Sequence, residues 1–304
     1  MIVAAENLVH RYGARVALSD VSFQVREREI FGVLGPNGGG KSTLFHILST
    51  MLAPTGGRAR VAGFDVERQP SEVRRRIGVV FQSQSLDKKL TVLENLRGQG
   101  HLFGMRGRPL SARINEVLER LGLADRRSDL AGALSGGLRR RVEIAKALLH
   151  RPPVLLMDEP ATGLDPGARL ELWRYVEELR ATQGITVLLT THILDEADRS
   201  DRLLLLHQGK VVAEGTPSEL KARIGGDVVL LDVAEPARIL DQIEQRLGVR
   251  GSASENGSVR IEIGNGHRFI AEVVEAFPGA IRSVALHKPT LEDVFLDETG
   301  ARFE

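Results

Sequence analysis

The sequence predicts an α/β protein with a mostly parallel sheet, followed by a small C-terminal α+β domain. A glycine-rich loop at residues 35–43 lies directly between a buried apolar run and a helical stretch. Apolar runs and helical patterns alternate up to about residue 206, as they do when helices cover both faces of a parallel sheet. Beyond Gly225 and Gly226, a shorter series of strands and helices begins again.

The individual elements follow from the spacing of apolar residues. Short alternating or continuous apolar runs predict strands, and apolar residues at helical spacing predict helices. Thr91 and Glu94 form a capping-box sequence, which predicts that a helix begins there. Before residue 225 we expect strands at 2–5, 16–25, 30–34, 60–62, 77–81, 154–157, 186–190 and 202–206, and helices after residue 41, after 91, around 114–121, and at 138–149, 167–182 and 193–199.

Composition excludes several classes of function. The net charge of +1 creates no strong field, so a nucleic-acid partner is not expected. The arginine runs at 74–76 and 139–141 lie in helical stretches and are interpreted as solvated helix faces. The chain contains no cysteine, which excludes disulfides, thiolate metal sites and cysteine nucleophiles.

Residues 1–7 do not resemble a signal peptide, and the strongest apolar runs are too short to span a bilayer. We therefore expect a soluble, cytoplasmic protein that reaches a membrane only through a partner.

The glycine-rich loop has the pattern of a phosphate-binding site. Residues 35–43 read Gly-Pro-Asn-Gly-Gly-Gly-Lys-Ser-Thr. Glycines let successive backbone N–H groups point at one anion, and the N-terminus of the following helix adds a favourable field. Lys41 can reach the β- and γ-phosphates of a nucleotide, and the Ser42 hydroxyl can bind Mg²⁺. The alternative is an ordinary turn between a strand and a helix, which the Lys-Ser spacing disfavours.

Two adjacent acids end the apolar run at 154–157. Because ligands bind at the carboxyl ends of parallel strands, Asp158 and Glu159 can lie beside the phosphate loop. Asp158 suits Mg²⁺, and Glu159 can polarise the water that attacks the γ-phosphate. The alternative is that the two acids stabilise the N-terminus of a following helix near Pro160.

A second anion-binding motif precedes these acids. Leu134, Ser135, Gly136 and Gly137 open the helix that begins near Leu138, so a hydroxyl and glycine amides gather at its N-terminus. One chain rarely needs two such motifs for one triphosphate. Two chains packed head to tail would use both, because each would complete the other's site.

Together these motifs resemble the ATP-binding subunits of ATP-binding-cassette (ABC) transporters, over about residues 1–220. Residues 35–43 resemble the Walker A loop, residues 134–137 the signature motif, and Asp158 with Glu159 the Walker B pair. Further single residues fit the family's other motifs in the correct order: Tyr12 and Val16 beside the adenine, Gln82 in the Q-loop, Asp165 in the D-loop and His192 as the switch histidine.

The resemblance implies a P-loop NTPase core of the ABC type, with an antiparallel β subdomain and a helical subdomain at about 88–150, within an ATPase domain of residues 1–224. It implies ATP hydrolysis with Mg²⁺ and catalytic roles for Glu159, His192 and Lys41. It also implies a dimer with a second copy, or with a paralogous subunit, around two Mg-ATP. The implied metal ligands are Ser42, Gln82 and Asp158, and the implied nucleotide contacts are Tyr12, Val16, Asn37, Gly38, Gly39, Gly40, Lys41, Ser42, Thr43, Gln82, Ser135, Gly136, Gly137 and Asp165.

The chain departs from the family pattern at two positions. Leu138 stands where the commonest signature has glutamine, and Gly39 stands where the phosphate loop usually has alanine or serine. Some drug-exporter ATPases also have an apolar residue at the first position, so Leu138 is interpreted as a subfamily feature. Neither residue carries a group that performs chemistry.

The C-terminal segment points to a branch of the family. Residues 225–304 are expected to form a small accessory domain, with strands at 228–233, 258–263 and 281–286 and helices at 237–247, 269–277 and after 289. Residues 288–296 resemble the end of ABC-2-type exporter ATPases, including drug-resistance pumps. This resemblance implies an integral membrane ABC-2-type permease as the partner, at the cytoplasmic face of the membrane. The alternative for these residues is a terminal helix with Leu291, Val294 and Phe295 packed on their own domain.

Three other functions are alternatives to an exporter ATPase. A soluble ABC protein acting on ribosomes or DNA usually has paired cassettes or a long coiled-coil insertion, and this chain has neither. A regulatory module that binds ATP without hydrolysis is disfavoured by Glu159 and His192. An importer ATPase differs only in the direction of transport, for which the resemblance of the tail is the one indication. The permease would select the transported substrate.

Overall fold

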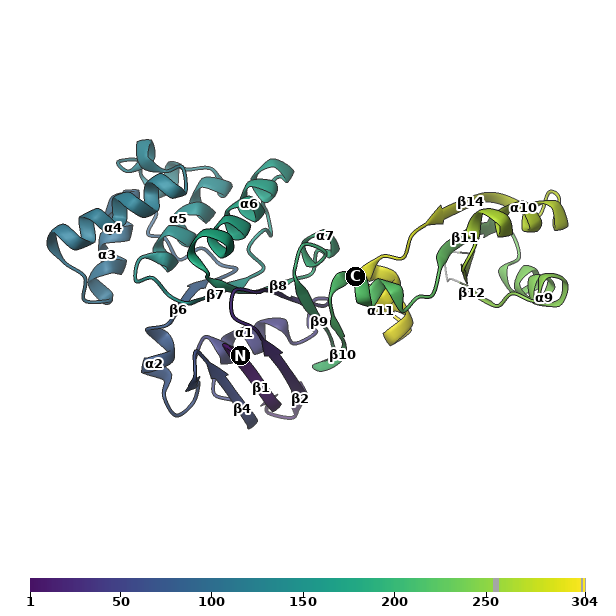
Figure 1. Cartoon of the computed structure of the whole chain (residues 1–304), viewed down its shortest axis with the longest axis horizontal. Coiled ribbons are helices and arrows are strands. Elements are labelled where there is room, and N and C mark those ends of the chain that lie inside the picture. Colours follow the sequence, from purple (N-terminus) through teal and green to yellow (C-terminus); the bar gives the residue numbers. More distant parts are fainter. Residues whose placement is uncertain (254–256, 302, 304) are drawn as a thin grey trace. The chain divides into compact units, whose positions relative to one another are not determined.

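The computed structural model describes residues 1–253, 257–301 and 303, which form two compact units, Met1–Gly215 and Thr216–Phe303 (Figure 1). This division places helix α8 (Pro217–Ala222) in the second unit, whereas the sequence analysis set the boundary at residue 224. A capping box between Thr216 and Glu219 begins α8 with reciprocal hydrogen bonds. A new helical element therefore starts directly after the first unit ends.

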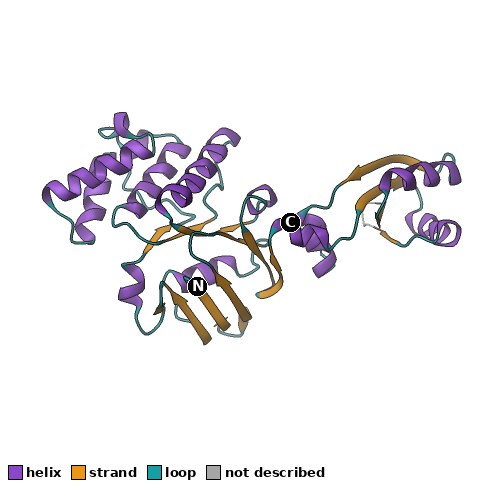
Figure 2. Cartoon of the chain, in the orientation of Figure 1, coloured by secondary structure: helices purple, strands orange, loops and turns teal. Residues whose placement is uncertain are grey.

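The first unit is built on a six-stranded sheet with the order β10-β9-β3-β8-β7-β6 (Figure 2). All neighbouring strands are parallel except β10, which is antiparallel to β9. The central strands β3, β7 and β8 are buried at every residue, which explains their continuous apolar sequences. The strands are β3 (Ile30–Leu34), β6 (Ile77–Val80), β7 (Val154–Asp158), β8 (Thr186–Thr191), β9 (Arg202–His207) and β10 (Lys210–Gly215).

A second sheet in this unit is antiparallel, as the family resemblance implied, and has the order β2-β1-β4-β5. Its strands are β1 (Val3–Tyr12), β2 (Arg15–Val25), β4 (Gly56–Val61) and β5 (Phe64–Asp65). One hydrophobic cluster joins the two sheets through helix α1 (Lys41–Leu48), whose Leu44, Phe45 and Leu48 are fully buried in it. The helix that follows the phosphate loop is therefore anchored on both sides.

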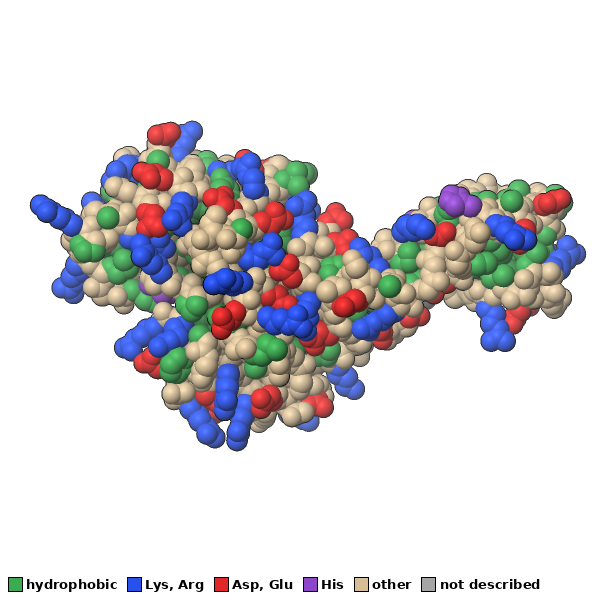
Figure 3. Space-filling view, viewed as in Figure 1, with side chains coloured by type: hydrophobic (Ala, Val, Ile, Leu, Met, Phe, Trp, Pro, Cys, Tyr) green, Lys and Arg blue, Asp and Glu red, His purple; other side chains and the backbone are tan. Residues whose placement is uncertain are grey.

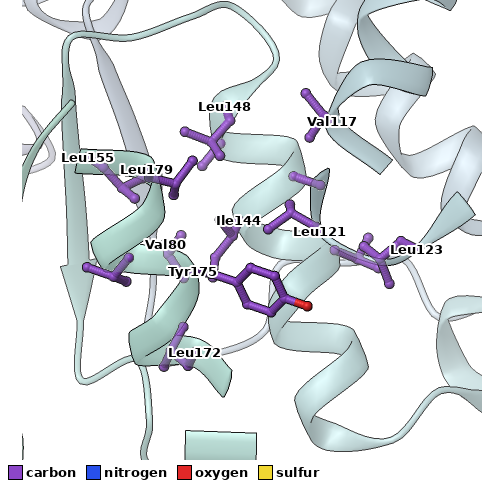
Figure 4. Close-up of a cluster of buried hydrophobic side chains, with 14 of the residues drawn as sticks. Val80, Val117, Leu121, Leu123, Ile144, Leu148, Leu155, Leu172, Tyr175 and Leu179 are labelled. Carbon is purple, nitrogen blue, oxygen red and sulfur yellow. The ribbon is translucent and has the colours of Figure 1, made fainter. Parts of the chain in front are cut away.

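Helices α3, α4, α5 and α6 pack around a second hydrophobic cluster (Figure 4), whereas Val73 of α2 lies in the first cluster. In this view, Ile144 and Leu148 of α5 face Tyr175 and Leu179 of α6, while Val117 comes from α4 and Leu121 directly follows that helix. The predicted capping box at Thr91 and Glu94 is confirmed at the start of α3. The helices are α2 (Pro70–Arg74), α3 (Val92–Leu102), α4 (Gly107–Arg120), α5 (Gly136–Leu148), α6 (Pro166–Gln183) and α7 (Leu194–Ala197), with two short 3-10 helices at Ala124–Arg126 and Ala131–Ala133.

The second unit contains an antiparallel sheet with the order β12-β13-β11-β14. Helices α9 and α10 bury Ile239, Ile243, Phe269 and Val273 in one cluster with sheet residues such as Val229. The short strand β12 was not expected from the sequence, because its three residues are exposed and carry no apolar pattern. The elements are β11 (Asp227–Val233), α9 (Pro236–Leu247), β12 (Gly251–Ala253), β13 (Ser258–Ile263), α10 (Gly266–Ala276), β14 (Ile281–His287) and α11 (Leu291–Thr299).

The terminal helix α11 packs within the second unit. Leu291, Val294 and Phe295 are 2%, 1% and 0% exposed, and α11 contacts α8. A capping box at Thr290 and Asp293 begins the helix, and Asp293 Oδ1 lies 3.1 Å from Arg260 Nη2 of β13. The interpretation that these apolar residues pack on their own domain is therefore confirmed.

Candidate nucleotide-binding site

The phosphate loop joins β3 to α1 and depends on glycine at specific positions. Gly40 is the N-cap of α1 and has a φ angle of 107°, which side chains disfavour. A Cβ atom on Gly40 would lie 2.7 Å from the Ala17 carbonyl oxygen, and one on Gly35 would lie 2.2 Å from the Leu206 carbonyl oxygen. The loop can therefore approach its neighbours this closely only with glycine at these two positions.

Lys41 is held at the centre of the loop. Its Nζ donates hydrogen bonds to the carbonyl oxygens of Gly35 (2.8 Å) and Pro36 (3.0 Å) and lies 3.2 Å from Glu159 Oε1. The side chain is only 4% exposed. A buried ammonium group needs such compensation, and a phosphate group could supply the same negative charge.

Glu159 is the point at which the predicted catalytic side chains meet. Its Oε2 accepts hydrogen bonds from Gln82 Nε2 (3.2 Å) and Thr162 Oγ1 (3.3 Å). His192 Nδ1 lies 3.1 Å from the same oxygen, although it makes no hydrogen bond there. The structure thus brings together residues that are far apart in the sequence.

The backbone of Glu159 has a strained, left-handed conformation. Its φ angle is 43°, in the left-handed region that costs a residue with a side chain about 1–2 kcal/mol. Its backbone N–H donates to Thr190 Oγ1 (3.0 Å) and to the Thr190 carbonyl oxygen (3.1 Å). Hydrogen bonds that Glu159 donates to the neighbouring strand β8 therefore hold this conformation at the end of β7.

Asp158 lies beside the loop and suits a hard cation. It is 4% exposed and accepts a 2.5 Å hydrogen bond from Thr190 Oγ1. Burial raises the pKa of Asp158, while the bond from Thr190 opposes that shift. Among the described residues, no group of three His, Asp or Glu side chains could hold a metal. One carboxylate with a hydroxyl fits Mg²⁺, which completes its shell with phosphate oxygens and water.

A pocket of about 250 Å³ lies over the phosphate loop. Tyr12, Lys41, Gln82 and Glu159 line this one cavity, whereas Val16 and Gly39 do not. The structure adds Arg15 and Ala17, which the sequence analysis missed because they carry no motif and are placed only by the β1–β2 hairpin. The other lining residues are Asn37, Gly38, Gly40, Ser42 and Thr43.

The signature and D-loop residues lie at helix N-termini outside this pocket. Ser135 is the N-cap of α5, where its side chain accepts a 3.3 Å hydrogen bond from the Leu138 N–H. Asp165 is the N-cap of α6 and accepts a 2.9 Å hydrogen bond from the Ala168 N–H. Gly136 and Gly137 begin α5, and a Cβ atom on Gly137 would lie 2.9 Å from Ala168 Cβ. Leu138 packs against the hydrophobic cluster of its own chain.

The arginine run at 139–141 corrects one prediction. Arg140 is only 4% exposed and donates to the carbonyl oxygens of Phe81 (2.6 Å) and Gln82 (3.2 Å). Arg141 pairs with Glu171 and is 17% exposed. This helix face is therefore packed rather than solvated, because the carbonyl and carboxylate acceptors lie inside. The run at 74–76 agrees better with the prediction, since Arg75 is 70% exposed.

Comparison with known proteins agrees with this geometry. Residues 18–162 match the ABC transporter family, and residues 215–299 match the family "ATP-binding protein DrrA1-3-like, C-terminal domain". The daunorubicin resistance ATP-binding protein DrrA2 of Streptomyces coeruleorubidus is 41% identical over 99% of this chain and 96% of its own length. The chain belongs to the ATP-binding proteins of ABC transporters. It is an ATPase of the type found in drug-resistance exporters.

Further relatives are similar to this ABC ATPase in sequence or in structure. The doxorubicin resistance ATP-binding protein DrrA of Mycobacterium tuberculosis is 39% identical over 94% of the chain and 89% of its own length. The ADP conformation of MJ1267, an ATP-binding cassette of an ABC transporter, has a TM-score of 0.66 and 33% identity over 72% of this chain and 92% of that one. A dimeric structure of the bacterial cassette MJ0796 has a TM-score of 0.64 and 29% identity over 70% of this chain and 98% of that one.

Within residues 1–253 and 257–301, every helix is too short or too polar to cross a bilayer. Figure 3 shows acidic and basic side chains interspersed over the drawn face.

Proposed function

We propose that two copies of this chain, or one copy and a paralogue, bind two Mg-ATP between them and drive export through a separate ABC-2-type permease. The observation that carries this proposal is the convergence of Lys41, Gln82 and His192 on Glu159, at 3.2, 3.2 and 3.1 Å. The four side chains come from α1, the loop after β6, the end of β8 and the end of β7. Such an arrangement can hold a triphosphate and activate a water molecule beside it.

Each side chain has a distinct role in this proposal. Lys41 neutralises the β- and γ-phosphates, and Glu159 is the general base that takes a proton from the attacking water. His192 contacts the γ-phosphate, and Tyr12 stacks on the adenine with Val16 beside it. Ser42, Asp158 and Gln82 would hold Mg²⁺, which supplies positive charge to the phosphate oxygens when bound.

The dimer follows from the position of the signature residues. Ser135, Gly136, Gly137 and Asp165 do not line the pocket of their own chain. The N-terminus of α5 can bind an anion, because its first N–H groups lack helical partners. In a head-to-tail dimer, the α5 N-terminus of each chain would contact the γ-phosphate bound to the other. The dimeric structure of the similar cassette MJ0796 supports a dimer for this chain.

Export through an ABC-2-type permease is supported by the second unit and by the relatives. The match to the DrrA1-3-like domain covers nearly all of the second unit, and two relatives similar over most of the chain are named for drug resistance. A Nod factor export ATP-binding protein of Paraburkholderia xenovorans is also 38% identical over 96% of the chain. We place the subunit at the cytoplasmic face of the membrane, bound to the permease.

Substitution of Glu159 by Gln tests the proposed mechanism. The amide cannot take the proton of the attacking water, so we expect ATP hydrolysis to fall by about a hundredfold or more. ATP binding should persist, and ATP-bound dimers should accumulate in size-exclusion chromatography. Glu177→Gln is the matched control, because Glu177 is an exposed residue of α6 outside the site. Hydrolysis at the normal rate by Glu159→Gln would contradict the assignment of the base.

A second experiment tests the membrane partner. The affinity-tagged ATPase is expressed in cells together with a candidate ABC-2-type permease. After detergent extraction of the membranes, the permease should remain bound to the purified ATPase. Recovery of ribosomes or DNA in place of a membrane protein would support the soluble alternative. Uptake into right-side-out vesicles, driven by ATP, would support an importer.

A further inference from the structure

Three charged side chains of α5, the helix that begins with the signature residues, form hydrogen bonds with the loop that carries Gln82. We call residues 81–87 the Gln82 loop; they lie between β6 and α3. Arg140, Glu143 and Lys146 occur at every third position of α5, so they follow one side of that helix. All three contact the backbone of the Gln82 loop.

Arg140 holds the start of this loop. Its Nη1 donates to the Phe81 carbonyl oxygen (2.6 Å) and to Glu143 Oε2 (2.9 Å), and its Nη2 donates to the Gln82 carbonyl oxygen (3.2 Å). Arg140 and Glu143 are 4% and 3% exposed. A guanidinium group can donate to several acceptors in a fixed plane, which an ammonium group cannot do. The two peptide groups that flank Gln82 are thereby oriented.

Glu143 and Lys146 hold the next part of the loop. The Ser85 N–H donates to Glu143 Oε1 at 2.6 Å, so both oxygens of this carboxylate are used. Lys146 Nζ donates to the Ser85 carbonyl oxygen (2.9 Å) and hydroxyl (3.2 Å). The backbone N–H and carbonyl of Ser85 are thus both bound to α5.

We infer that Arg140, Glu143 and Lys146 are positioning residues that fix the Gln82 loop on α5 and so aim Gln82 at Glu159. The Gln82 side chain, which follows directly from the clamped backbone, donates to Glu159 Oε2 at 3.2 Å. The helix that starts with the signature residues therefore also sets the position of a side chain in the pocket of the same chain. We call the contacts of Arg140, Glu143 and Lys146 with the Gln82 loop the clamp. The expected effect on catalysis rests on the proposed roles of Gln82 and Glu159, whereas the clamp itself does not.

Two variants and one control test the clamp in the full-length protein. Arg140→Met/Glu143→Leu replaces the buried pair with apolar side chains, a change that usually leaves folding intact because no charge remains unpaired. Lys146→Met removes the contacts to Ser85 from a half-buried position. Arg141→Met is the control, because Arg141 lies on the same helix but pairs with Glu171 of α6.

The main measurement is amide hydrogen exchange of peptides covering residues 82–87, without nucleotide. We expect exchange about tenfold faster in both test variants and unchanged in Arg141→Met, as follows from loss of hydrogen bonds to charged groups. In steady-state hydrolysis, the test variants should lose kcat about tenfold while KM for ATP changes less than about twofold. A purely structural role would neither accelerate exchange of this loop selectively nor lower kcat while KM stays nearly unchanged.

Two outcomes would overturn the inference. One is loop exchange within about twofold of the wild-type rate in Lys146→Met, which decides the question even if the double variant does not fold. The other is equal acceleration in Arg141→Met. If the loop loosens but Glu159→Gln hydrolyses ATP normally, the clamp stands and the proposed catalytic roles fail.

Discussion

Lys41 and Glu159 form a buried ion pair, with Nζ of the lysine 3.2 Å from Oε1 of the glutamate. Their side chains are 4% and 6% exposed, so water compensates neither charge. The pair connects the first residue of α1 to the end of β7, through the side chains proposed to bind phosphate and to activate water. Each residue therefore contributes to the stability of the site as well as to its chemistry.

The first prediction is that substitutions of Lys41 and Glu159 have non-additive effects on the free energy of unfolding. Lys41→Met leaves a buried carboxylate without its counter-charge, so we expect the free energy of unfolding to fall by about 3 kcal/mol. Lys41→Met/Glu159→Gln should recover much of that loss, because neither charge remains. Urea unfolding of the two single variants and the double variant measures the coupling. Strictly additive effects would show that the pair has no energetic role.

The second prediction concerns the glycine at the N-cap of α1. Gly40 and Gly63 both have positive φ angles, 107° and 84°, but only a Cβ on Gly40 would meet other atoms, 2.7 Å from the Ala17 carbonyl oxygen. Gly63→Ala should therefore cost about 1–2 kcal/mol through backbone strain alone. Gly40→Ala should cost more and should also weaken ATP binding, measured with a fluorescent nucleotide. Equal effects of the two substitutions on stability and binding would contradict the predicted clash.

The third prediction concerns Arg15, which lines the pocket with its guanidinium 3.9 Å from the position of a Cβ on Gly38. Its side chain is exposed, so its attraction to the phosphates is screened by water. Arg15→Ala should raise the Kd for ATP by about threefold to fivefold at low salt, and less at high salt. Arg11→Ala is the control, since Arg11 is exposed on β1 and does not line the pocket. A salt-independent effect, or the same effect in the control, would argue against a charge contact.

The fourth prediction is a pH dependence that originates at Glu196. This residue is 2% exposed and accepts a 2.7 Å hydrogen bond from Thr191 Oγ1, and burial raises its pKa above the ordinary 4.5. The native state thus binds the proton more tightly than the unfolded state, so this group lowers stability as the pH rises above 4.5. Glu196→Gln keeps an acceptor for Thr191 but removes the ionisation.

Urea unfolding between about pH 4.5 and pH 8 checks this sign. The free energy of unfolding of Glu196→Gln, minus that of the wild type, should increase with pH and level off above the native pKa. Glu177→Gln, at an exposed position, should show no such trend. A difference that decreases with pH would mean that the ionised carboxylate is favoured in the folded protein.

The parts of the fold that depend on local pattern were predictable from the sequence. The fully buried strands β3, β7 and β8 have continuous apolar sequences, and the capping box at Thr91 and Glu94 has the hydrogen bonds that its residues indicate. The motif residues at the ends of β3, β7 and β8 also meet, because parallel strands bring their carboxyl ends to one edge.

Other features depended on contacts between distant segments. Arg140 stands in a run of arginines within a helix, a pattern that is typical of a solvated face. Its burial is explained by the hydrogen bonds to the Phe81 and Gln82 carbonyl oxygens, which lie far away in the sequence. Arg15 lines the pocket because the β1–β2 hairpin places it beside the phosphate loop. The unit boundary at Gly215 was missed because α8 packs against α11, which lies far along the chain.

The position of α11 changes how truncations of this protein should be interpreted. Removing the last turns of the chain would delete Leu291, Val294 and Phe295, and it would uncover α8 and leave Arg260 without Asp293. A shortened protein that no longer functions would then report on the folding of residues 216–303 as much as on any lost contact with a permease. Exchanging exposed residues of α11 one at a time, such as Glu292, would separate the two effects.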